Sequence, residues 1–316
     1  MLSLNQRALG IVQQMIQDAK ALDVAVSTLD NGTVVVDAGI DVPGSLEAGL
    51  LFARVCLGGL GTVDFCQLPF GDAWLPGVTV SVSHPVVACM ASQYAGWAVK
   101  AGGFFAMASG PARALYAGEA LFEHLAYRDR SSVAVLALEG RDLPPVAAAD
   151  KVARKCGVAP DQLYLLIAPT ASLAGSVQVA ARVVETGLHK MHEVGFDINT
   201  VISGIGTCPL ASLARKDLQA IGRTNDAVLY GGRAWYTVRT DDARIEEVIE
   251  RLPSCSSRDH GTLFYDLFKR YDGDFYKIDP LLFSPAEVYI NNATSGRTFQ
   301  AGAVAPDLIR ASLLAQ

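Results

Sequence analysis

The sequence predicts a mixed α+β protein in two lobes. Its 316 residues, 51% of them hydrophobic and 18% charged, are enough for a sizeable core and two domains. Short apolar runs alternate with amphipathic segments, but without the regular strand-helix-strand order of an all-parallel sheet. The Pro144-Pro145 pair suggests a boundary, so we expect lobes over 1–143 and 144–316, either of which can be discontinuous in sequence.

Periodicity and turn residues place the elements before this boundary. Asn31-Gly32 supplies the positive φ that a tight hairpin needs, and Ser45 follows Pro43-Gly44 as a helix start. The glycine-rich stretch 57–62 ends that helix and lacks the Gly-Lys-Ser/Thr of a phosphate-binding loop. In order we expect a helix over 3–22, two strands within 24–38, a helix over 45–57, a strand over 78–82, a helix from 111 and a strand over 131–138.

The second half continues the alternation. The phrase GRTNDAVLYGGRAWYTV (222–238) predicts a polar loop, a strand, a Gly-Gly turn and a second strand, which together make a hairpin. The other expected elements are a helix over 144–155, a strand over 163–168, one long helix over 176–195, helices near 209–220, 241–252 and 262–271, a strand within 284–299 and a helix over 306–314.

The long helix, GSVQVAARVVETGLHKMHEVG (175–195), carries two stripes along its length. At about 100° per residue, one stripe is apolar and the next is polar. The apolar stripe is Val177, Ala181, Val184, Leu188 and Met191, and the polar stripe is Gln178, Arg182, Glu185, His189 and His192. Because the remaining sides are mostly apolar, the helix should be buried and its polar stripe should line a cleft.

Arg182 and Glu185 are three residues apart on this stripe, close enough for their side chains to touch. A carboxylate beside a guanidinium in a cleft is a candidate general base. The same spacing also suits an exposed ion pair on a solvated face, which contributes little, and the pattern alone slightly favours that interpretation. A second candidate lies at Ser109-Gly110-Pro111, where a helix start near Ser109 and Arg113 suits an anion but equally an ordinary turn.

Composition excludes several classes of function. The net charge of −6 is mild and shows no long run of one sign, so a nucleic-acid groove or basic membrane patch has no support. The six cysteines contain no C-x-x-C pair, which indicates reduced thiols rather than a zinc ribbon or disulfide framework. The amino terminus lacks the features of a secretory signal, and polar residues interrupt the most apolar run, 163–184, so we expect neither export nor a membrane span.

Five phrases together resemble the methenyltetrahydromethanopterin cyclohydrolase family. They occur in similar order and spacing across nearly the whole chain, and such long, non-repetitive phrases are far more specific than a lone glycine motif. The phrases are AGLLFARVCLGGLG (48–61), ASGPARAL (108–115), RVVETGLHKMHEVGFDI (182–198), GRTNDAVLYGG (222–232) and SPAEVYINN (284–292).

This resemblance implies a cytoplasmic enzyme of one-carbon metabolism. The family interconverts N5,N10-methenyl-tetrahydromethanopterin plus water with N5-formyl-tetrahydromethanopterin, without a metal or nucleotide cofactor. The resemblance also implies a homotrimer of two-domain subunits, with the pterin in a cleft between the two domains. The family's paired catalytic arginine and glutamate fall on Arg182 and Glu185.

Substrate contacts follow from the same phrases and from loop composition. We expect polar contacts to the pterin from Asn225, Asp226, Asn291 and Asn292, and anion contacts from Ser109 and Arg113 to the phosphate-bearing tail of the substrate. No metal ligand is expected.

Two other functions stay open at this stage. Glu185, His189 and His192 share one helix face and would suit a metal-dependent hydrolase, although no H-E-x-x-H phrase accompanies them. A non-catalytic pterin-binding protein is the other alternative. Retention of both Arg182 and Glu185 argues against it, because binding alone does not require them.

Overall fold

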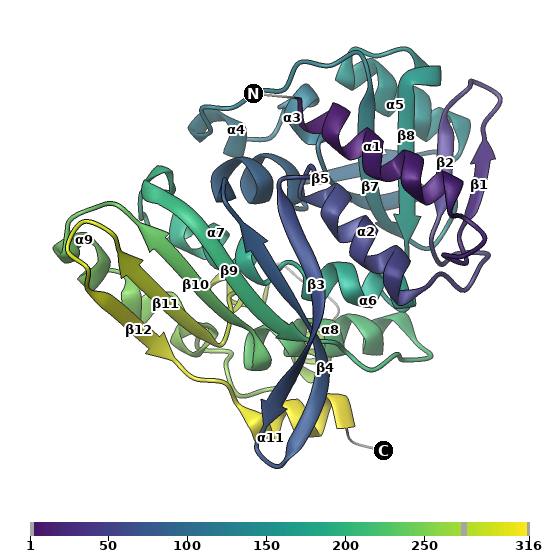
Figure 1. The fold of residues 1–316 in the computed structure, drawn as a ribbon. Helices are drawn as coiled ribbons and strands as arrows, with labels where there is room; N and C mark the ends of the chain where they lie inside the picture. The colour runs from purple at the N-terminus through teal and green to yellow at the C-terminus, as the bar shows by residue number, and fades with distance from the viewer. Residues whose placement is uncertain (1–2, 273–276, 315–316) are drawn as a thin grey trace. The chain divides into compact units, whose positions relative to one another are not determined.

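The computed structural model describes residues 3–272 and 277–314, and it contains two compact units (Figure 1). The first unit comprises Met1–Gly61 and Val87–Gln178, and the second comprises Thr62–Val86 and Val179–Gln316. Each contains a six-stranded mixed sheet with helices, which confirms the predicted α+β class. The boundary expected after residue 143 falls inside the first unit.

The sheet of the first unit has a parallel centre and antiparallel edges. β2, β8 and β7 run parallel to one another, whereas β1 pairs antiparallel with β2, and β6 pairs antiparallel with both β7 and β5. In spatial order its strands are β1 (Ala25–Thr28), β2 (Val34–Asp37), β8 (Leu163–Ala168), β7 (Ala134–Gly140), β6 (Phe104–Ser109) and β5 (Trp97–Ala101).

Helices cover both faces of this sheet. Alternate residues of β7 and β8 face opposite sides, so Leu136 and Leu165 pack with α5, whereas Val135 and Leu166 belong to the core beneath α1 and α2. Figure 1 shows α1 and α2 together on one face of the sheet. The helices are α1 (Leu4–Gln17), α2 (Leu46–Cys56), α3 (Ala112–Tyr116), α4 (Leu121–His124), α5 (Val146–Cys156), α6 (Leu173–Ala180), the π-helix η1 (Val86–Gln93) and the 3-10 turn η2 (Pro160–Gln162).

The sheet of the second unit is antiparallel except where β10 runs parallel to β11. Its core face carries Ala234, Tyr236 and Val238 of β10, all buried, while the intervening residues are more exposed. In spatial order the strands are β12 (Thr298–Gly302), β11 (Glu287–Asn292), β10 (Arg233–Val238), β9 (Val201–Pro209), β4 (Ala73–Val82) and β3 (Gly61–Phe70).

Two helices of the second unit, α7 and α8, pack against this sheet. α8 also contacts α10 and α11. The helices are α7 (Val183–Glu193), α8 (Asp217–Gly231), α9 (Asp242–Glu246), α10 (Phe264–Arg270) and α11 (Pro306–Ile309), with the shorter η3 (Ile198–Thr200), η4 (Ile249–Arg251), η5 (Ser254–Ser256), η7 (Pro280–Leu282) and the π-helix η8 (Arg310–Leu314).

Several predicted elements are confirmed where local chemistry was specific. Asn31-Gly32 connects β1 to β2, and Gly32 has φ of 89°. Ser45 caps α2 by accepting the N–H of Ala48 at 3.1 Å. β8 occupies the predicted span 163–168, and α5 begins directly after Pro145.

The single long helix predicted over 176–195 is wrong, because the chain forms α6 and α7 with a turn at Ala181 and Arg182. The N–H of Arg182 bonds back to the carbonyl of Val179 at 3.0 Å, a tighter three-residue closure. The two helices serve different cores. Ala174 of α6 belongs to a core of the first unit, whereas α7 packs on β9 and β10 of the second.

The predicted hairpin over 222–238 is also wrong. Residues 217–231 form α8, and only 233–238 form a strand. The short apolar run AVLY (227–230) suits a strand and a buried helix equally well, and periodicity alone does not separate the two. The helix expected near 209–220 begins later than predicted: Pro209 ends β9, and the helix starts at Asp217. β3 was missed, since its burial alternates irregularly and Pro69 interrupts its pattern.

α7 approaches the sheet closely because glycines replace side chains at the contact. A Cβ at Gly204 would lie 2.7 Å from Cγ1 of Val184, and one at Gly206 would lie 2.7 Å from Cγ1 of Val183. Within α7, Gly187 faces the hydroxyl of Tyr236, which donates to the carbonyl of Val184 at 2.7 Å. This packing determines where the first turn of α7 lies.

We therefore expect Gly187→Ala to destabilise the protein by about 1–3 kcal/mol, because the added methyl would collide with the Tyr236 hydroxyl. Gly10→Ala is the matched control: Gly10 lies in α1 with no atom near an added Cβ, and the higher helix propensity of alanine should stabilise by up to about 1 kcal/mol. Urea unfolding measures the stability change of each variant. Similar changes for the two substitutions would contradict the close packing of α7 on the sheet.

Candidate functional site

Arg182 and Glu185 lie at the start of α7. Arg182 is the N-cap residue with φ −82° and ψ 0°, and its carbonyl accepts the N–H and the hydroxyl of Thr186 at 2.8 and 2.7 Å. Glu185 is therefore in the first turn, where the partial positive charge of a helix N-terminus stabilises a carboxylate. The break between α6 and α7 creates this N-terminus, which an unbroken helix would not provide.

The two side chains form an ion pair that is nearly buried. Nη1 of Arg182 lies 3.7 Å from Oε2 of Glu185, and the side chains are only 12% and 7% exposed. The alternative of an exposed ion pair on a solvated face is therefore wrong. A pair of this kind is screened little by solvent, and removing one partner would leave a buried charge with less compensation.

The rest of α7 is anchored within the second unit. Lys190 donates from Nζ to the hydroxyl of Ser256 at 3.3 Å and to the carbonyl of Leu281, and burial lowers the pKa of Lys190 to about 8. Together with the Tyr236 bond to Val184, these contacts link α7 to both the sheet and the segments around η5 and η7. The turn that carries Glu185 is thus held at several points.

His189 and His192 interact with Glu193. Each has a ring nitrogen 3.7 Å from the Glu193 carboxylate. Burial lowers the pKa of His189, an effect that Glu193 opposes and His192 reinforces, so a neutral imidazole is favoured. Among residues 3–272 and 277–314, no group of three or more His, Cys, Asp or Glu side chains is arranged to bind a metal ion. The metal-dependent alternative gains no geometric support from the described residues.

Ser109 and Arg113 are both buried in the first unit. Arg113 forms a bidentate pair with Glu119, at 2.8 Å from Nε and 2.7 Å from Nη2, and its Nη1 donates to the carbonyls of Met90 and Ser92 at 3.0 Å. Ser109 lies 3.3 Å from the sulfur of Cys56. The geometry therefore gives Arg113 a structural set of contacts, and its contact with a phosphate stays a prediction.

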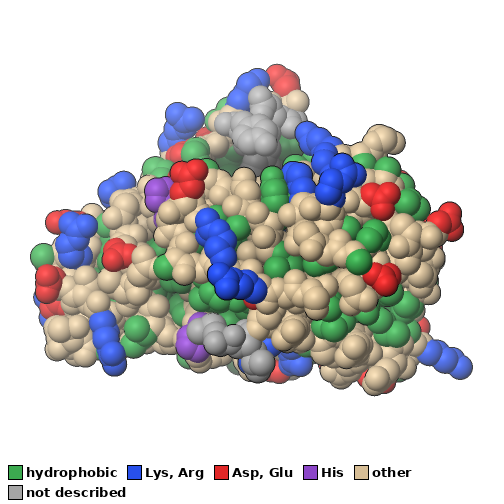
Figure 2. All heavy atoms as spheres, turned by 90° about the horizontal axis from the view of Figure 1, so that it is seen from above, with side chains coloured by type: hydrophobic (Ala, Val, Ile, Leu, Met, Phe, Trp, Pro, Cys, Tyr) green, Lys and Arg blue, Asp and Glu red, His purple; other side chains and the backbone are tan. Residues whose placement is uncertain are grey.

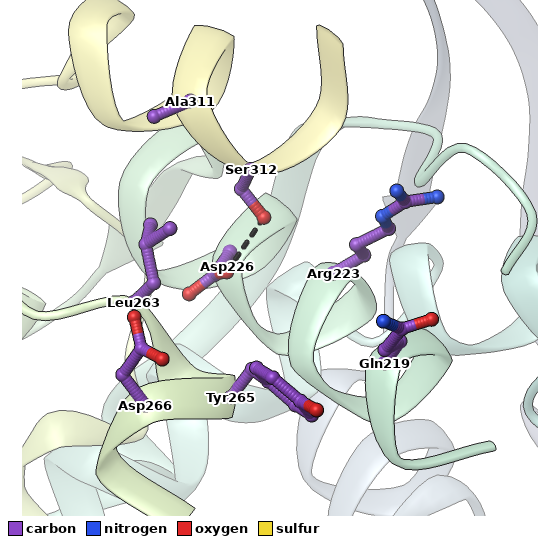
Figure 3. Close-up of a pocket in the computed structure, with 8 residues that line it drawn as sticks. All are labelled: Gln219, Arg223, Asp226, Leu263, Tyr265, Asp266, Ala311 and Ser312. Atoms are coloured by element: carbon purple, nitrogen blue, oxygen red, sulfur yellow. Dashed lines mark hydrogen bonds between the residues drawn. The ribbon is translucent and has the colours of Figure 1, made fainter. Parts of the chain in front are cut away.

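Asn225 and Asp226 lie on α8 rather than in a loop. Asn225 donates to the carbonyl of Ile221 at 2.8 Å. Asp226 is buried and accepts the N–H of Phe264 at 2.8 Å and the hydroxyl of Ser312 at 2.6 Å, a bond drawn in Figure 3. Burial raises the pKa of Asp226 to about 6, although both hydrogen bonds oppose the shift.

Asp226 also lines a cavity of about 150 Å³ in the second unit, shown in Figure 3. Arg223, at the same cavity, donates to the carbonyls of Ser212 and Leu213 at 3.3 and 2.7 Å. The remaining lining residues are Gln219, Leu263, Tyr265, Asp266, Ala311 and Ser312. The cavity lies among α8, α10 and η8, and Asp226 links all three elements.

Asn291 and Asn292 end β11. Asn291 donates to the hydroxyl of Thr298 at 3.1 Å, across to the neighbouring strand. Asn292 is buried, donating to the carbonyl of Thr240 at 2.8 Å and to Asp242 at 2.7 Å. Asn225, Asp226, Asn291 and Asn292 thus all have internal partners, and their contacts with a substrate stay predictions.

A polar cluster in the first unit was missed from the sequence. Glu139 at the end of β7 accepts hydrogen bonds from the hydroxyl of Thr170 and from Nε2 of Gln178, the latter at 3.2 Å. Gln178 stood on the predicted polar stripe, but Glu139 and Thr170 were not singled out. The available signal was a polar residue at the carboxyl end of each of two consecutive buried strands.

The arrangement of surface charge agrees with the small net charge of −6. On the face drawn in Figure 2, basic and acidic side chains are interspersed among neutral atoms. Over the described part of the chain, no helix has both the length and the apolar character that crossing a membrane requires.

Comparison with known proteins gives one consistent result. A family model described as Cyclohydrolase (MCH) matches residues 3–313. The chain is similar to a methenyltetrahydromethanopterin cyclohydrolase of Methylobacterium sp. (strain 4-46), with 47% identity over 98% of this chain and 97% of the relative. Proteins of the same name from Methanocaldococcus jannaschii and Methanosarcina barkeri are 46% and 41% identical, covering 99% and 98% of this chain and 98% and 97% of their own lengths.

The raised pKa of Asp226 predicts a pH effect on stability. Between about pH 4 and 6 the folded protein binds a proton that the unfolded chain releases, so this contribution to stability is lost as the pH rises. A shift from 3.8 to about 6 corresponds to about 3 kcal/mol at most. Asp226→Asn should not lose stability in this way. The free energy of unfolding of the variant, relative to that of wild type, should therefore increase from pH 4.5 to 7.

Urea unfolding at both pH values tests this expectation. Asp307→Asn is the control, because Asp307 is an exposed carboxylate on α11 that does not contribute to the shift at Asp226. The same pH slope for wild type and Asp226→Asn would show that the buried carboxyl is not responsible.

Proposed function

The chain belongs to the Cyclohydrolase (MCH) family, and we propose that it catalyses the reaction for which its relatives are named. In that reaction N5,N10-methenyl-tetrahydromethanopterin and water are interconverted with N5-formyl-tetrahydromethanopterin. The observation that carries the proposal is similarity along 98–99% of the chain, joined to a buried Arg182–Glu185 pair at the start of α7.

Glu185 is the proposed acid/base group. The methenyl carbon lies between two nitrogens of an amidinium cation and is already electrophilic, so the catalyst chiefly has to position and deprotonate a water. As the water oxygen bonds to this carbon, Glu185 takes one water proton. Glu185 then delivers that proton to N10 as the C–N10 bond breaks. The hydroxyl of the adduct loses its own proton to solvent as it becomes the formyl oxygen, so one proton is released per turnover.

Arg182 has a supporting role in this proposal. Its guanidinium would repel a cationic substrate, and it favours the ionised form of a nearby carboxylate. We assign it the orientation of Glu185 or of the attacking water, together with maintenance of the carboxylate charge. Desolvation by the bound pterin acts in the opposite direction and makes the carboxylate a more effective proton acceptor.

The remaining parts of the proposal follow the family. The enzyme works in the cytoplasm as a homotrimer, without a metal or nucleotide cofactor. Polar contacts to the pterin come from Asn225, Asp226, Asn291 and Asn292, and contacts to the phosphate-bearing tail come from Ser109 and Arg113. Arg113, Asp226 and Asn292 have internal partners and are each at most 1% exposed, so these three are the least accessible members of the set.

Substitution of Glu185 tests the catalytic assignment. Glu185→Gln retains the size of the side chain but cannot accept a proton, so turnover of methenyl-tetrahydromethanopterin should fall by about 10²–10⁴-fold. Glu193→Gln is the matched control, being the same change on the same helix at a side chain that is 47% exposed. Turnover is measured by loss of methenyl-pterin absorbance. Near wild-type turnover of Glu185→Gln would refute Glu185 as the acid/base group.

A second substitution tests Arg182. Lysine retains the charge but lacks the planar fork of a guanidinium, so Arg182→Lys should lower turnover by at least about tenfold and alter the pH profile of kcat. If turnover and pH profile both matched wild type, the orienting role of Arg182 would be wrong.

Chelation distinguishes the proposed reaction from metal-dependent hydrolysis. We expect full activity after prolonged dialysis against a chelator, and a double variant His189→Ala/His192→Ala that retains a measurable fraction of turnover, because neither imidazole takes part in the proposed steps. An activity that is abolished by chelator and restored by one added divalent metal ion would reverse this choice.

A further inference from the structure

The carboxyl ends of β7 and β8 form a switch point in the first unit. These strands are parallel neighbours, with Glu139 opposite Ala168 at their ends. The chain leaves β7 toward α5 and leaves β8 toward α6. Residues of α5 such as Val152 pack in the core on one face, whereas Ala174 of α6 packs in the core on the other face. In open α/β sheets, ligands bind at the carboxyl ends of the strands where two connections diverge to opposite faces in this way.

Glu139 lies at this point, and side chains from two further segments fix its carboxylate. One oxygen accepts the hydroxyl of Thr170, two residues beyond β8, and the other accepts Nε2 of Gln178 on α6 at 3.2 Å. Both donors are neutral, so these bonds orient the carboxylate without cancelling its charge. Each carboxylate oxygen has a second lone pair, and the residue is half-buried rather than sealed in the core.

Asp37, on the same sheet, is a carboxylate with a structural role and serves as a comparison for Glu139. It ends β2, which lies on the other side of β8 from β7, and it is buried. Its oxygens accept the backbone N–H groups of Gly39, Ile40 and Asp41 at 2.7–2.9 Å. Those bonds close the turn after β2. Glu139 instead accepts hydrogen bonds from two side chains. These bonds orient the charged carboxylate and do not stabilise a backbone turn.

We propose that Glu139, oriented by Thr170 and Gln178, is a substrate-binding residue that accepts two N–H groups from the 2-aminopyrimidinone edge of the pterin. That edge presents a ring N–H and an exocyclic amine side by side, a planar fork that matches the two oxygens of a carboxylate. The inference rests on the proposed function, because it takes the pterin as the substrate. In this role Glu139 recognises the pterin and transfers no proton.

Steady-state kinetics of Glu139→Gln provide the first test. Glutamine retains the size of the side chain and an acceptor for Thr170, but it loses the charge and one acceptor oxygen. We expect KM for methenyl-tetrahydromethanopterin to rise by about 10–100-fold while kcat changes by less than about threefold, since each lost hydrogen bond to a charged group weakens binding. Glu47→Gln, on the exposed side of α2 in the same unit, should leave both constants unchanged.

A pair of inhibitors isolates the edge that Glu139 recognises. Wild type should bind pterin at least about tenfold more tightly than 2-deaminopterin, because loss of the amine removes one of the two N–H groups that the Glu139 carboxylate accepts. Glu139→Gln should discriminate between them by less than about threefold, and Thr170→Val should fall between wild type and Glu139→Gln. A structural role alone would lower the unfolding temperature of Glu139→Gln without changing this ratio.

The outcomes separate the two proposals. If wild type hydrolyses the methenyl pterin, and Glu139→Gln retains the wild-type KM and the wild-type preference for pterin, the role of Glu139 is refuted and the proposed function stands. If wild type neither hydrolyses the methenyl pterin nor binds pterin, both fail.

Discussion

The close contact between α7 and strands β9 and β10 is the constraint on which the position of the Arg182–Glu185 turn depends. It is possible because Gly204, Gly206 and Gly187 leave room for Val184, Val183 and the Tyr236 hydroxyl. A helix seated this way cannot slide or rotate without a steric clash, so its first turn has one position. That turn carries Glu185, and the helix N-terminus and Arg182 both favour its negative charge.

Two buried arginine–glutamate pairs in the chain have different surroundings. Arg113 is fully buried, and its guanidinium makes two bonds to Glu119 and two more to backbone carbonyls. Such a set of contacts stabilises the segments that meet there and leaves the charge fully compensated. Arg182 lies farther from its glutamate, at 3.7 Å, a distance that gives electrostatic attraction without a short bidentate bond. A separation of 3.7 Å is compatible with the proposed role of Glu185 in proton exchange.

The sequence predicts local features well and long-range ones poorly. Asn31-Gly32, Ser45 and the buried strand 163–168 were predictable because each has a local chemical signature. The break at Arg182 was not, since both stripes continue in phase across it. The α8 region was misassigned because four apolar residues do not separate a helix from a strand. For the site, the Arg182–Glu185 contact followed from spacing, whereas the Glu139–Thr170 bond joins residues 31 positions apart and required the sheet.

Glu185 and Glu139 are carboxylates whose local environments suit different tasks. Glu185 in the second unit lies beside a guanidinium at a helix N-terminus, so its charge is already favoured before substrate binds. Glu139 in the first unit is oriented by a hydroxyl and an amide, neither of which neutralises it. A carboxylate with neutral donors gains most from a ligand that brings N–H groups to it. A carboxylate beside a cation gains less from such a ligand, so we propose recognition for Glu139 and proton transfer for Glu185.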